Sequence, residues 1–261
     1  MNPSGAAAPP FYGWLLMAGV ALSLVFWVRL ARKDSRMLGL WLSALLGAFV
    51  GAKLLYLIAE GGRDWGTPDA WHRLRTGKSI VGALFGGYLA VEGAKQILGY
   101  RGATGDWFAL IVPAGIALGR AGCWLNGCCL GRVCANPAWY TIDDAHGISR
   151  WPSVPLELGF NILALGMLAG LRRRGRFPGN LFHLYLIAYG LFRGVHEFAR
   201  DTPRILGPFS GYALAAFGLA LFGAVRFQQR LQAPAVIGVS PDNTADRPLP
   251  PPRPPTPHRV R

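Results

Sequence analysis

Residues 38–59 read LGLWLSALLGAFVGAKLLYLIA, a run that is apolar or small throughout apart from the single charged side chain of Lys53. Its length matches the roughly 20 residues that a helix needs to span the hydrocarbon core of a bilayer. Comparable apolar runs recur along the chain. They lie at residues 11–30, 79–99, 106–119, 154–171, 181–199 and 209–227. We therefore predict an all-α, polytopic membrane protein with about seven transmembrane helices.

The composition supports the same class. Hydrophobic residues make up 52% of the 261 residues and charged residues only 15%, and the mean hydropathy is +0.29. That is more apolar surface than one soluble core of this size needs. The net charge of +14 fits loops that face anionic lipid, whereas binding to nucleic acid is not expected, because no basic stripe interleaves with aromatic residues in a soluble module.

Two segments bear on the organisation of the chain. The run at 106–119 is short and contains Pro113, so we expect a tilted or partly re-entrant element there. From residue 231 onward the chain is rich in proline, which excludes both helix and packed core. We therefore predict one transmembrane domain over residues 1–230 and a disordered cytoplasmic tail over residues 231–261.

Basic residues set the expected orientation. No basic residue precedes the first apolar run, and Arg29, Arg32 and Lys33 follow its apolar part, so this run is an anchor and not a removable signal peptide. The positive-inside rule then places this basic cluster in the cytoplasm. The N-terminus and the loop over residues 120–153 are expected on the outer side.

The segment at 119–132 reads GRAGCWLNGCCLGR and is the strongest candidate for an anion site. Glycines allow backbone N–H groups to close around an oxyanion, and the guanidinium groups of Arg120 and Arg132 match phosphate oxygens. The segment therefore suits a lipid headgroup. In the alternative interpretation, the glycines only allow close packing of membrane helices.

Polar residues inside the apolar runs are further candidates, because a charge at bilayer depth usually faces a cavity or a partner. Tyr189, Arg193 and Glu197 recur at a spacing of four and share one stripe of a helix, either as a functional set or as a structural ion pair. His196 could reach the same cavity from the adjacent face. Glu157 is expected in the first helical turn of its run, where it could hold a basic group, take a proton or simply favour the helix dipole.

All four cysteines lie within one short segment, at positions 123, 128, 129 and 134. An even number of cysteines on the outer side favours disulfides, and we predict one that involves Cys123 or Cys134, with Cys128 nearest the headgroup. A reactive thiol activated by Arg120 is the second interpretation. A thiolate metal site is the third, because the spacing is not that of a typical zinc hairpin, and simple packing is the fourth.

These motifs, taken in order, resemble the prolipoprotein diacylglyceryl transferase family of bacterial membrane enzymes. Residues 51–56, GAKLLY, are similar to the family's GARxxY, and residues 119–132 are similar to its signature GRxGNFxNGExxGR. The remaining matches are Tyr12-Gly13, Arg150-Trp151-Pro152-Ser153 followed by Glu157, and Tyr189-Gly190 followed by Arg193, Glu197 and Phe198. The resemblance covers most of residues 11–225.

Several positions depart from the family pattern, and three of them bear on the chemistry. Residues 79–84 read SIVGAL where the family has SFHGGL, so Val81 replaces a histidine. Cys123 and Cys128 replace the asparagine and the glutamate of the signature. The base that would take a proton is therefore unassigned, with His196, Glu197 or a cysteine thiolate as candidates.

The resemblance implies a lipid-headgroup cavity at the bacterial inner membrane and transfer of a diacylglyceryl group from phosphatidylglycerol to the lipobox cysteine of a prolipoprotein signal peptide. Membrane lipid and that signal peptide are the expected partners, and no cofactor or metal is expected. Other possibilities are a transferase of the same fold with another acceptor, or an inactive protein that binds phospholipid or handles thiol redox. The catalytic set implied is Arg120, Arg193, Glu197, Glu157, Tyr189 and Cys128, with substrate contacts from Asn126, Gly122, Gly131, Tyr12, His196 and Cys123. Arg120 and Arg193 would hold the phosphate, Asn126 and Tyr189 would donate hydrogen bonds, and the two glutamates would hold the arginines or help to move the proton.

Overall fold

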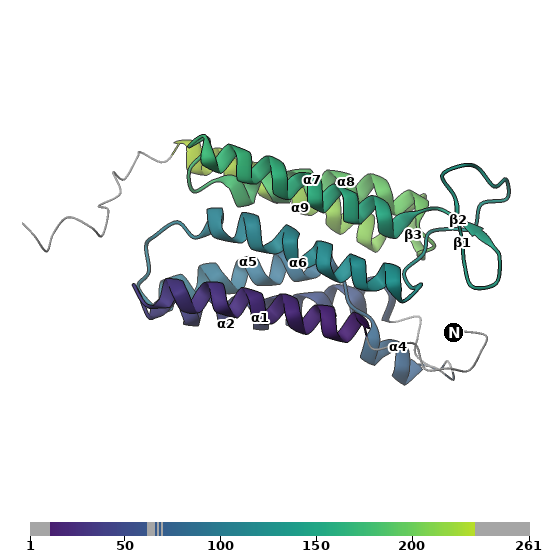
Figure 1. Ribbon diagram of the computed structural model, residues 1–261, viewed down its shortest axis with the longest axis horizontal. Coiled ribbons are helices and arrows are strands. Elements are labelled where there is room, and N and C mark those ends of the chain that lie inside the picture. The colour runs from purple at the N-terminus through teal and green to yellow at the C-terminus, as the bar shows by residue number, and fades with distance from the viewer. Residues whose placement is uncertain (1–10, 62–65, 67, 69, 233–261) are drawn as a thin grey trace, which may run out of the picture.

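The computed structural model describes residues 11–61, 66, 68 and 70–232, and these residues are mostly helical. Each predicted apolar run contains a long helix, so the all-α class is confirmed (Figure 1). These helices are α1 (Phe11–Ala31), α2 (Arg36–Tyr56), α5 (Ile80–Ile97), α6 (Gly105–Leu125), α7 (Ser153–Arg173), α8 (Leu181–His196) and α9 (Gly211–Gln232).

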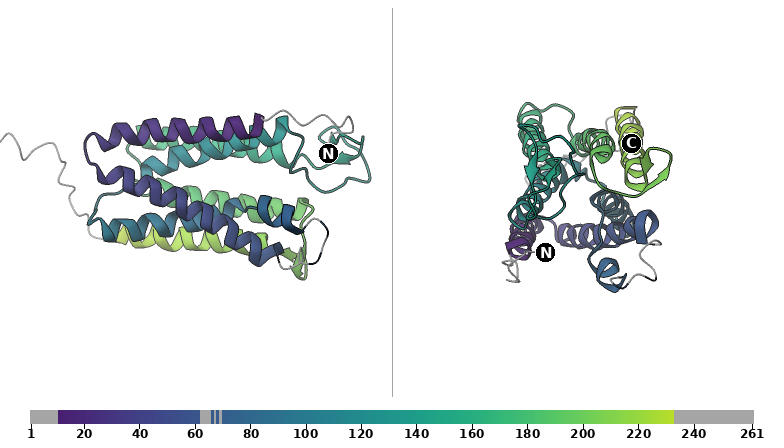
Figure 2. Two further views of the ribbon diagram at one scale, coloured as in Figure 1. Left: turned by 90° about the horizontal axis from the view of Figure 1, so that it is seen from below. Right: turned by 90° about the vertical axis from the view of Figure 1, so that its right-hand side faces the viewer.

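Five of these helices are long and apolar enough to cross a membrane, namely α1, α2, α6, α7 and α9. Helices α5 and α8 have 18 and 16 residues, so seven crossings stay a prediction. Large apolar side chains such as Trp14, Phe49 and Leu163 are exposed on the helices, which is the surface expected of a bundle whose outside faces lipid. Figure 2 shows the helices running side by side along the long axis.

Short elements gather at one end of the bundle, where α4 and strands β1 to β3 lie in Figure 1. Strands β1 (Ile142–Asp143) and β2 (Ser149–Arg150) form an antiparallel pair, as do β3 (Arg204–Leu206) and β4 (Phe209–Ser210). The other short elements are a π-helical turn η1 (Leu57–Gly61), helix α4 (Ala70–Thr76) and a 3₁₀ turn η2 (Glu197–Ala199).

Helices α2 and α5 make the most extensive contact in the bundle. Glycines allow this approach, since a Cβ on Gly86 would overlap the carbonyl oxygen of Gly47, and one on Gly82 would overlap that of Gly51. Small residues at this spacing let two membrane helices bring their backbones into contact. The contact fixes Ser79, which caps α5 and accepts a hydrogen bond from the N–H of Gly82 (3.3 Å).

We expect Gly86→Ala to lower the free energy of unfolding by about 1–3 kcal/mol, because the added methyl group forces the two helices apart. Gly93→Ala is the matched control, since Gly93 lies on the same helix with nothing within 4 Å of an added Cβ. Thermal unfolding in detergent measures both variants. Equal midpoints for the two variants would contradict this account of the α2–α5 contact.

Helix α6 corrects the prediction for residues 106–119. It runs without interruption from Gly105 to Leu125 and has Pro113 inside it, so a partly re-entrant element is wrong. Proline removes one backbone hydrogen bond, but Pro113 is buried and α6 packs against α1, α7 and α8. Neighbouring helices that cover the freed carbonyl let a proline remain in such a helix.

Two further helix boundaries differ from expectation. Helix α8 ends at His196, so Glu197 lies in the following 3₁₀ turn η2 and not on the helix. Helix α9 continues to Gln232, which shortens the predicted tail by two residues. The predicted tail from residue 233 onward lies outside the described residues.

Candidate active site

A polar cavity of about 550 Å³ opens at the end of the bundle that carries the short strands. Residues of α2, α5, α6, α8 and α9, of the turn η1 and of the surrounding loops line it. The charged side chains along its wall comprise five cations and three acids, which leaves an excess of positive charge. They are Lys78, Arg120, Arg150, Arg193, Arg200, Glu60, Asp144 and Asp201. A cavity of this charge favours an anionic ligand.

Arg120, Glu157 and Tyr189 meet at the base of the site, from α6, α7 and α8. The Glu157 carboxylate is fully buried. Its Oε1 accepts hydrogen bonds from Arg120 Nη2 (3.0 Å) and the Tyr189 hydroxyl (2.8 Å), and its Oε2 lies 2.9 Å from Arg120 Nη2. A buried ion pair of this kind needs such additional hydrogen bonds to hold its charges.

The position of Glu157 corrects the sequence prediction. It is the fifth residue of α7, which begins at Ser153, so it lies beyond the first helical turn. Arg120, and not the helix dipole, is therefore the main partner of its charge. Two further hydrogen bonds help to position Glu157. Asn161 Nδ2 donates to the Glu157 carbonyl (2.8 Å), and the Tyr185 hydroxyl donates to Asn161 Oδ1 (2.7 Å).

The guanidinium of Arg120 keeps an unused donor. Arg120 is only 7% exposed, yet its Nε has no hydrogen-bond partner among the described residues. A buried donor without a partner is costly, and Arg120 lines the cavity. An oxyanion in the cavity would satisfy this donor.

Arg193 pairs with Glu197 across the end of α8. The Thr202 hydroxyl donates to Glu197 Oε1 (2.7 Å), and Arg200 Nε lies 3.9 Å from Glu197 Oε2. Glu197 is fully buried, while Arg193, Arg200 and Thr202 line the cavity. The buried carboxylate therefore holds two cations at the cavity wall.

The loop after α6 is tied to the segment after α8. The N–H of Arg132 donates to the Ala199 carbonyl (3.0 Å), and the N–H of Gly131 donates to the Trp151 carbonyl (3.1 Å). A Cβ on Gly131 would overlap Trp151 and Ser153. Gly131 is thus required for close packing, and its N–H is not free for a phosphate. The expected oxyanion contact of Gly131 is wrong.

Three of the four cysteines form a cluster, and all four are free thiols, so the predicted disulfide is not formed. The sulfur atoms of Cys123, Cys128 and Cys129 all lie within 4.8 Å of one another. Cys134 stands apart, with its Sγ 3.9 Å from the Arg132 carbonyl. Cys129, and not Cys128 as predicted, lines the cavity.

Three of the sequence-predicted residues, Asn126, Gly122 and His196, do not line the cavity. Asn126 is exposed at the end of α6, and Gly122 is buried within that helix. His196 is buried and stacks on Phe192, with ring centroids 5.1 Å apart. Tyr12 belongs to α1, but its side chain is outside the described part of the chain. Val81 is buried in the apolar core, so no ionisable group takes the place of the family's histidine there.

The sequence analysis missed several residues of the wall. Tyr212 donates a hydrogen bond to Glu60 Oε2 (3.0 Å), and both line the cavity together with Tyr56. Elsewhere on the wall, Arg150 Nε donates to Asp144 Oδ2 (2.7 Å), and this hydrogen bond lowers the pKa of Asp144 to about 2. Tyr56 and Arg150 stand in motifs that were recognised. Tyr212 carries no local signal, because only the packing of α9 against η1 brings it to the site.

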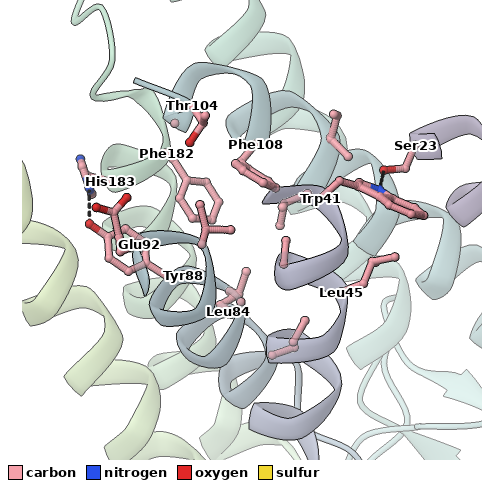
Figure 3. A pocket seen from close by; sticks show the side chains of 18 of the residues that line it. Ser23, Trp41, Leu45, Leu84, Tyr88, Glu92, Thr104, Phe108, Phe182 and His183 are labelled. Atoms are coloured by element: carbon pink, nitrogen blue, oxygen red, sulfur yellow. Dashed lines mark hydrogen bonds between the residues drawn. The ribbon is translucent and has the colours of Figure 1, made fainter. Parts of the chain in front are cut away.

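A second, apolar cavity of about 260 Å³ lies among α1, α2, α5, α6 and α8. Leu45, Leu84, Phe108 and Phe182 point into it in Figure 3. The Tyr88 hydroxyl and His183 Nε2, 3.0 Å apart, form a polar edge beside Glu92 (Figure 3). Ile80 lines both cavities, so they are neighbours.

Comparison with known proteins identifies the family of the chain. A model of the prolipoprotein diacylglyceryl transferase family matches residues 6–237. The chain belongs to this family. Within the prolipoprotein diacylglyceryl transferase family, the motif residues Arg120, Glu157 and Tyr189 of this member form one hydrogen-bonded group. Arg193 pairs with Glu197 beside it, although Val81, Cys123 and Cys128 depart from the family pattern.

Similar proteins include several phosphatidylglycerol–prolipoprotein diacylglyceryl transferases. The enzyme of Clostridium tetani is 27% identical over 208 residues, which cover 74% of this chain and 81% of that protein. The enzyme of Pseudoalteromonas atlantica is 30% identical over 232 residues, covering 86% and 76% respectively. The enzyme of Geobacter sulfurreducens is 36% identical over 155 residues, covering 56% and 59%.

Proposed function

We propose that this prolipoprotein diacylglyceryl transferase moves a diacylglyceryl group from phosphatidylglycerol to the cysteine of a prolipoprotein. The observation that carries the proposal is the pair of buried guanidinium groups, Arg120 and Arg193, at the wall of one polar cavity. They come from different helices, and each is held by a buried glutamate. Such a pair suits one phosphodiester headgroup.

The reaction forms one C–S bond and breaks two bonds, the S–H bond of the acceptor and a C–O bond of the lipid, and the proton passes to water in the cavity. The acceptor thiol loses its proton, its sulfur attacks the glyceryl carbon, and the C–O bond to the phosphate breaks, so that glycerol phosphate leaves. Negative charge therefore grows on the phosphate oxygen in the transition state. Donors that are already in place around that charge lower the barrier. Arg120 and Arg193 supply such donors.

The two glutamates act as positioning residues. Glu157 fixes Arg120, and Glu197 fixes Arg193 and Arg200. The Tyr189 hydroxyl donates a hydrogen bond to Glu157. With this bond formed, Tyr189 helps to hold Glu157 and does not donate to a phosphate. Neither glutamate is free to serve as a base while it pairs with an arginine.

The acceptor and the orientation complete the proposal. The acceptor is the lipobox cysteine of a signal peptide, and the membrane is the bacterial inner membrane with the polar cavity on its outer side. The basic residues at the end of α7 and the start of the α7–α8 connection, Arg172, Arg173, Arg174 and Arg176, support this orientation, because basic loops favour the cytoplasm.

The overall test is mass analysis of products after the purified protein has reacted with phosphatidylglycerol and a lipobox peptide. We expect a peptide heavier by one diacylglyceryl group together with free glycerol phosphate. A peptide with serine at the acceptor position is the control. Glycerol phosphate release without a modified peptide would favour the transferase with another acceptor, and no reaction at all would contradict the proposal.

The acyl chains are assigned to the apolar cavity, because it adjoins the polar cavity at Ile80. We expect Ala83→Phe, which fills the apolar cavity, to raise KM severalfold for dipalmitoyl phosphatidylglycerol and to leave KM for a dibutyryl analogue nearly unchanged. Leu89→Phe is the control, since Leu89 lies on the same helix but is exposed. An equal effect of Ala83→Phe on both lipids would contradict the assignment.

A further inference from the structure

We propose that Cys123, Cys128 and Cys129 bind one Zn²⁺ ion, and that the fourth coordination position takes the thiol of the acceptor cysteine. The inference rests on the proposed transfer to a thiol. It departs from the sequence-based expectation of no metal. Zinc in catalytic sites is held by three protein ligands and keeps one position open for water or substrate.

The positions of the three sulfur atoms fit such a site. All lie within 4.8 Å of one another, and three sulfurs bonded to one zinc at tetrahedral angles lie roughly 3.8 Å apart. A contraction of about 1 Å is within the reach of side-chain rotation. The backbone already holds the group: the N–H of Cys128 donates to the Cys123 carbonyl (3.1 Å), and Cys129 adopts a left-handed conformation with φ 61°.

The described residues supply three ligands for the proposed zinc ion and not a fourth. Among the described residues, no histidine, aspartate or glutamate joins these three sulfurs, and Cys134 lies outside the cluster. A structural zinc site has four protein ligands, whereas an incomplete set of three leaves room for a substrate. Cys129 lines the polar cavity, so the open position is reached from the side on which the phosphate would bind.

The charge of the surroundings fits as well. Three thiolates and one Zn²⁺ carry a net charge of −1, which requires a cation nearby. Arg120 and Arg200 line the same cavity as Cys129, and Arg200 Nη1 donates to the Cys129 carbonyl (3.4 Å). The site would therefore adjoin the phosphate-binding arginine.

A zinc ion would also explain how the acceptor thiol loses its proton without a protein base. The apolar Val81 stands where the family has a histidine, and Glu157 and Glu197 are paired with arginines. A thiol that coordinates zinc is deprotonated outright. The acceptor thiol would release its proton to water in the cavity on binding and attack the glyceryl carbon as the thiolate. The C–O bond then breaks, glycerol phosphate leaves, and the thioether product, a weaker ligand, dissociates.

Metal analysis of the full-length protein tests the site without reference to activity. The protein is purified without a metal-affinity step and equilibrated with ZnCl₂, and unbound metal is removed. We expect about one zinc per chain in the wild type and in Cys134→Ser, the matched control, and substantially less in Cys123→Ser, Cys128→Ser and Cys129→Ser. Equal zinc in all five proteins, no zinc in the wild type, or a disulfide within the cluster after isolation without reductant would overturn the proposal.

Cobalt substitution tests the open position. Co²⁺ in the site should give thiolate-to-metal absorption bands, and a lipobox peptide should strengthen these bands, whereas the same peptide with serine should not. Bands that do not respond to the cysteine peptide would overturn the acceptor role. Cys129→Ser should also lower transfer at least tenfold, while Cys134→Ser keeps it.

Different results would contradict the zinc site and the diacylglyceryl transfer. Stoichiometric zinc and a peptide-dependent cobalt spectrum in a protein that releases no glycerol phosphate would retain the thiol-binding zinc site and contradict the transferase. Full transfer activity in Cys129→Ser or in a zinc-free protein would retain the transferase and overturn the zinc site.

Discussion

Arg193→Ala should lower diacylglyceryl transfer by on the order of 100- to 1000-fold, the loss expected when one donor to a developing oxyanion is removed. Arg193 is buried at the cavity wall and pairs with Glu197, and water that enters the cavity in the variant would not carry the charge of its guanidinium. Arg193→Lys should also be poor, because an ammonium group cannot reproduce the planar fork of donors. The rate of glycerol phosphate release from phosphatidylglycerol measures both variants.

Two controls separate this chemical role from a loss of structure. Arg173→Ala removes an exposed arginine that does not line the cavity and lies at the other end of α7 from Glu157, and it should keep full activity. Glu197 retains Thr202 and Arg200 as partners in Arg193→Ala, so membrane insertion should be preserved. Near-normal turnover in a correctly inserted Arg193→Ala protein would contradict the phosphate-binding role.

Glu157→Ala should destabilise the protein by about 3–5 kcal/mol, because it leaves the buried charge of Arg120 without its counterion. It also removes the acceptor of the Tyr189 hydroxyl. Glu157→Gln keeps the shape of the side chain and one acceptor oxygen, so it should unfold at a higher temperature than Glu157→Ala. Transfer should fall in both variants, because Arg120 loses the carboxylate that orients it. Thermal unfolding in detergent measures the loss of stability, and the transfer rate measures the loss of activity.

Tyr189→Phe is the matched comparison for Glu157. It removes one hydrogen bond to the same carboxylate and leaves the ion pair with Arg120 in place. The expected loss is about 1 kcal/mol, the net contribution of a typical hydrogen bond, or up to about twice that because the acceptor is charged. A Glu157→Ala protein as stable as Tyr189→Phe would show that Arg120 does not depend on Glu157.

The membrane class follows from the sequence because apolar runs of this length have few other stable forms. A backbone in lipid must satisfy its own hydrogen bonds, so the run at 38–59 can hardly avoid a helix. The same logic makes a charge within an apolar run conspicuous, and it indicated Glu157 and Arg193, whereas the glycine-rich segment at 119–132 indicated Arg120. The ordered motifs then identified the family, which the match over residues 6–237 confirms.

The tertiary structure decided which of these side chains meet and which stand apart. The spacing of Tyr189, Arg193 and Glu197 on one stripe could not show that Tyr189 contacts Glu157 of α7 while Arg193 contacts Glu197. Such choices depend on how far each helix is rotated against its neighbours, and local sequence does not encode that rotation.

The loop after α6 shows the same limit. The sequence of this loop predicted an oxyanion contact at Gly131 and a headgroup contact at Cys128. The structure instead packs Gly131 against Trp151 and brings Cys129 to the cavity. The path of this loop is set by hydrogen bonds to residues far along the chain, such as that from Arg132 to Ala199. The sequence alone thus determined a membrane helix bundle and its family, whereas long-range packing decided which atoms face the cavity and gathered three sulfurs at its edge.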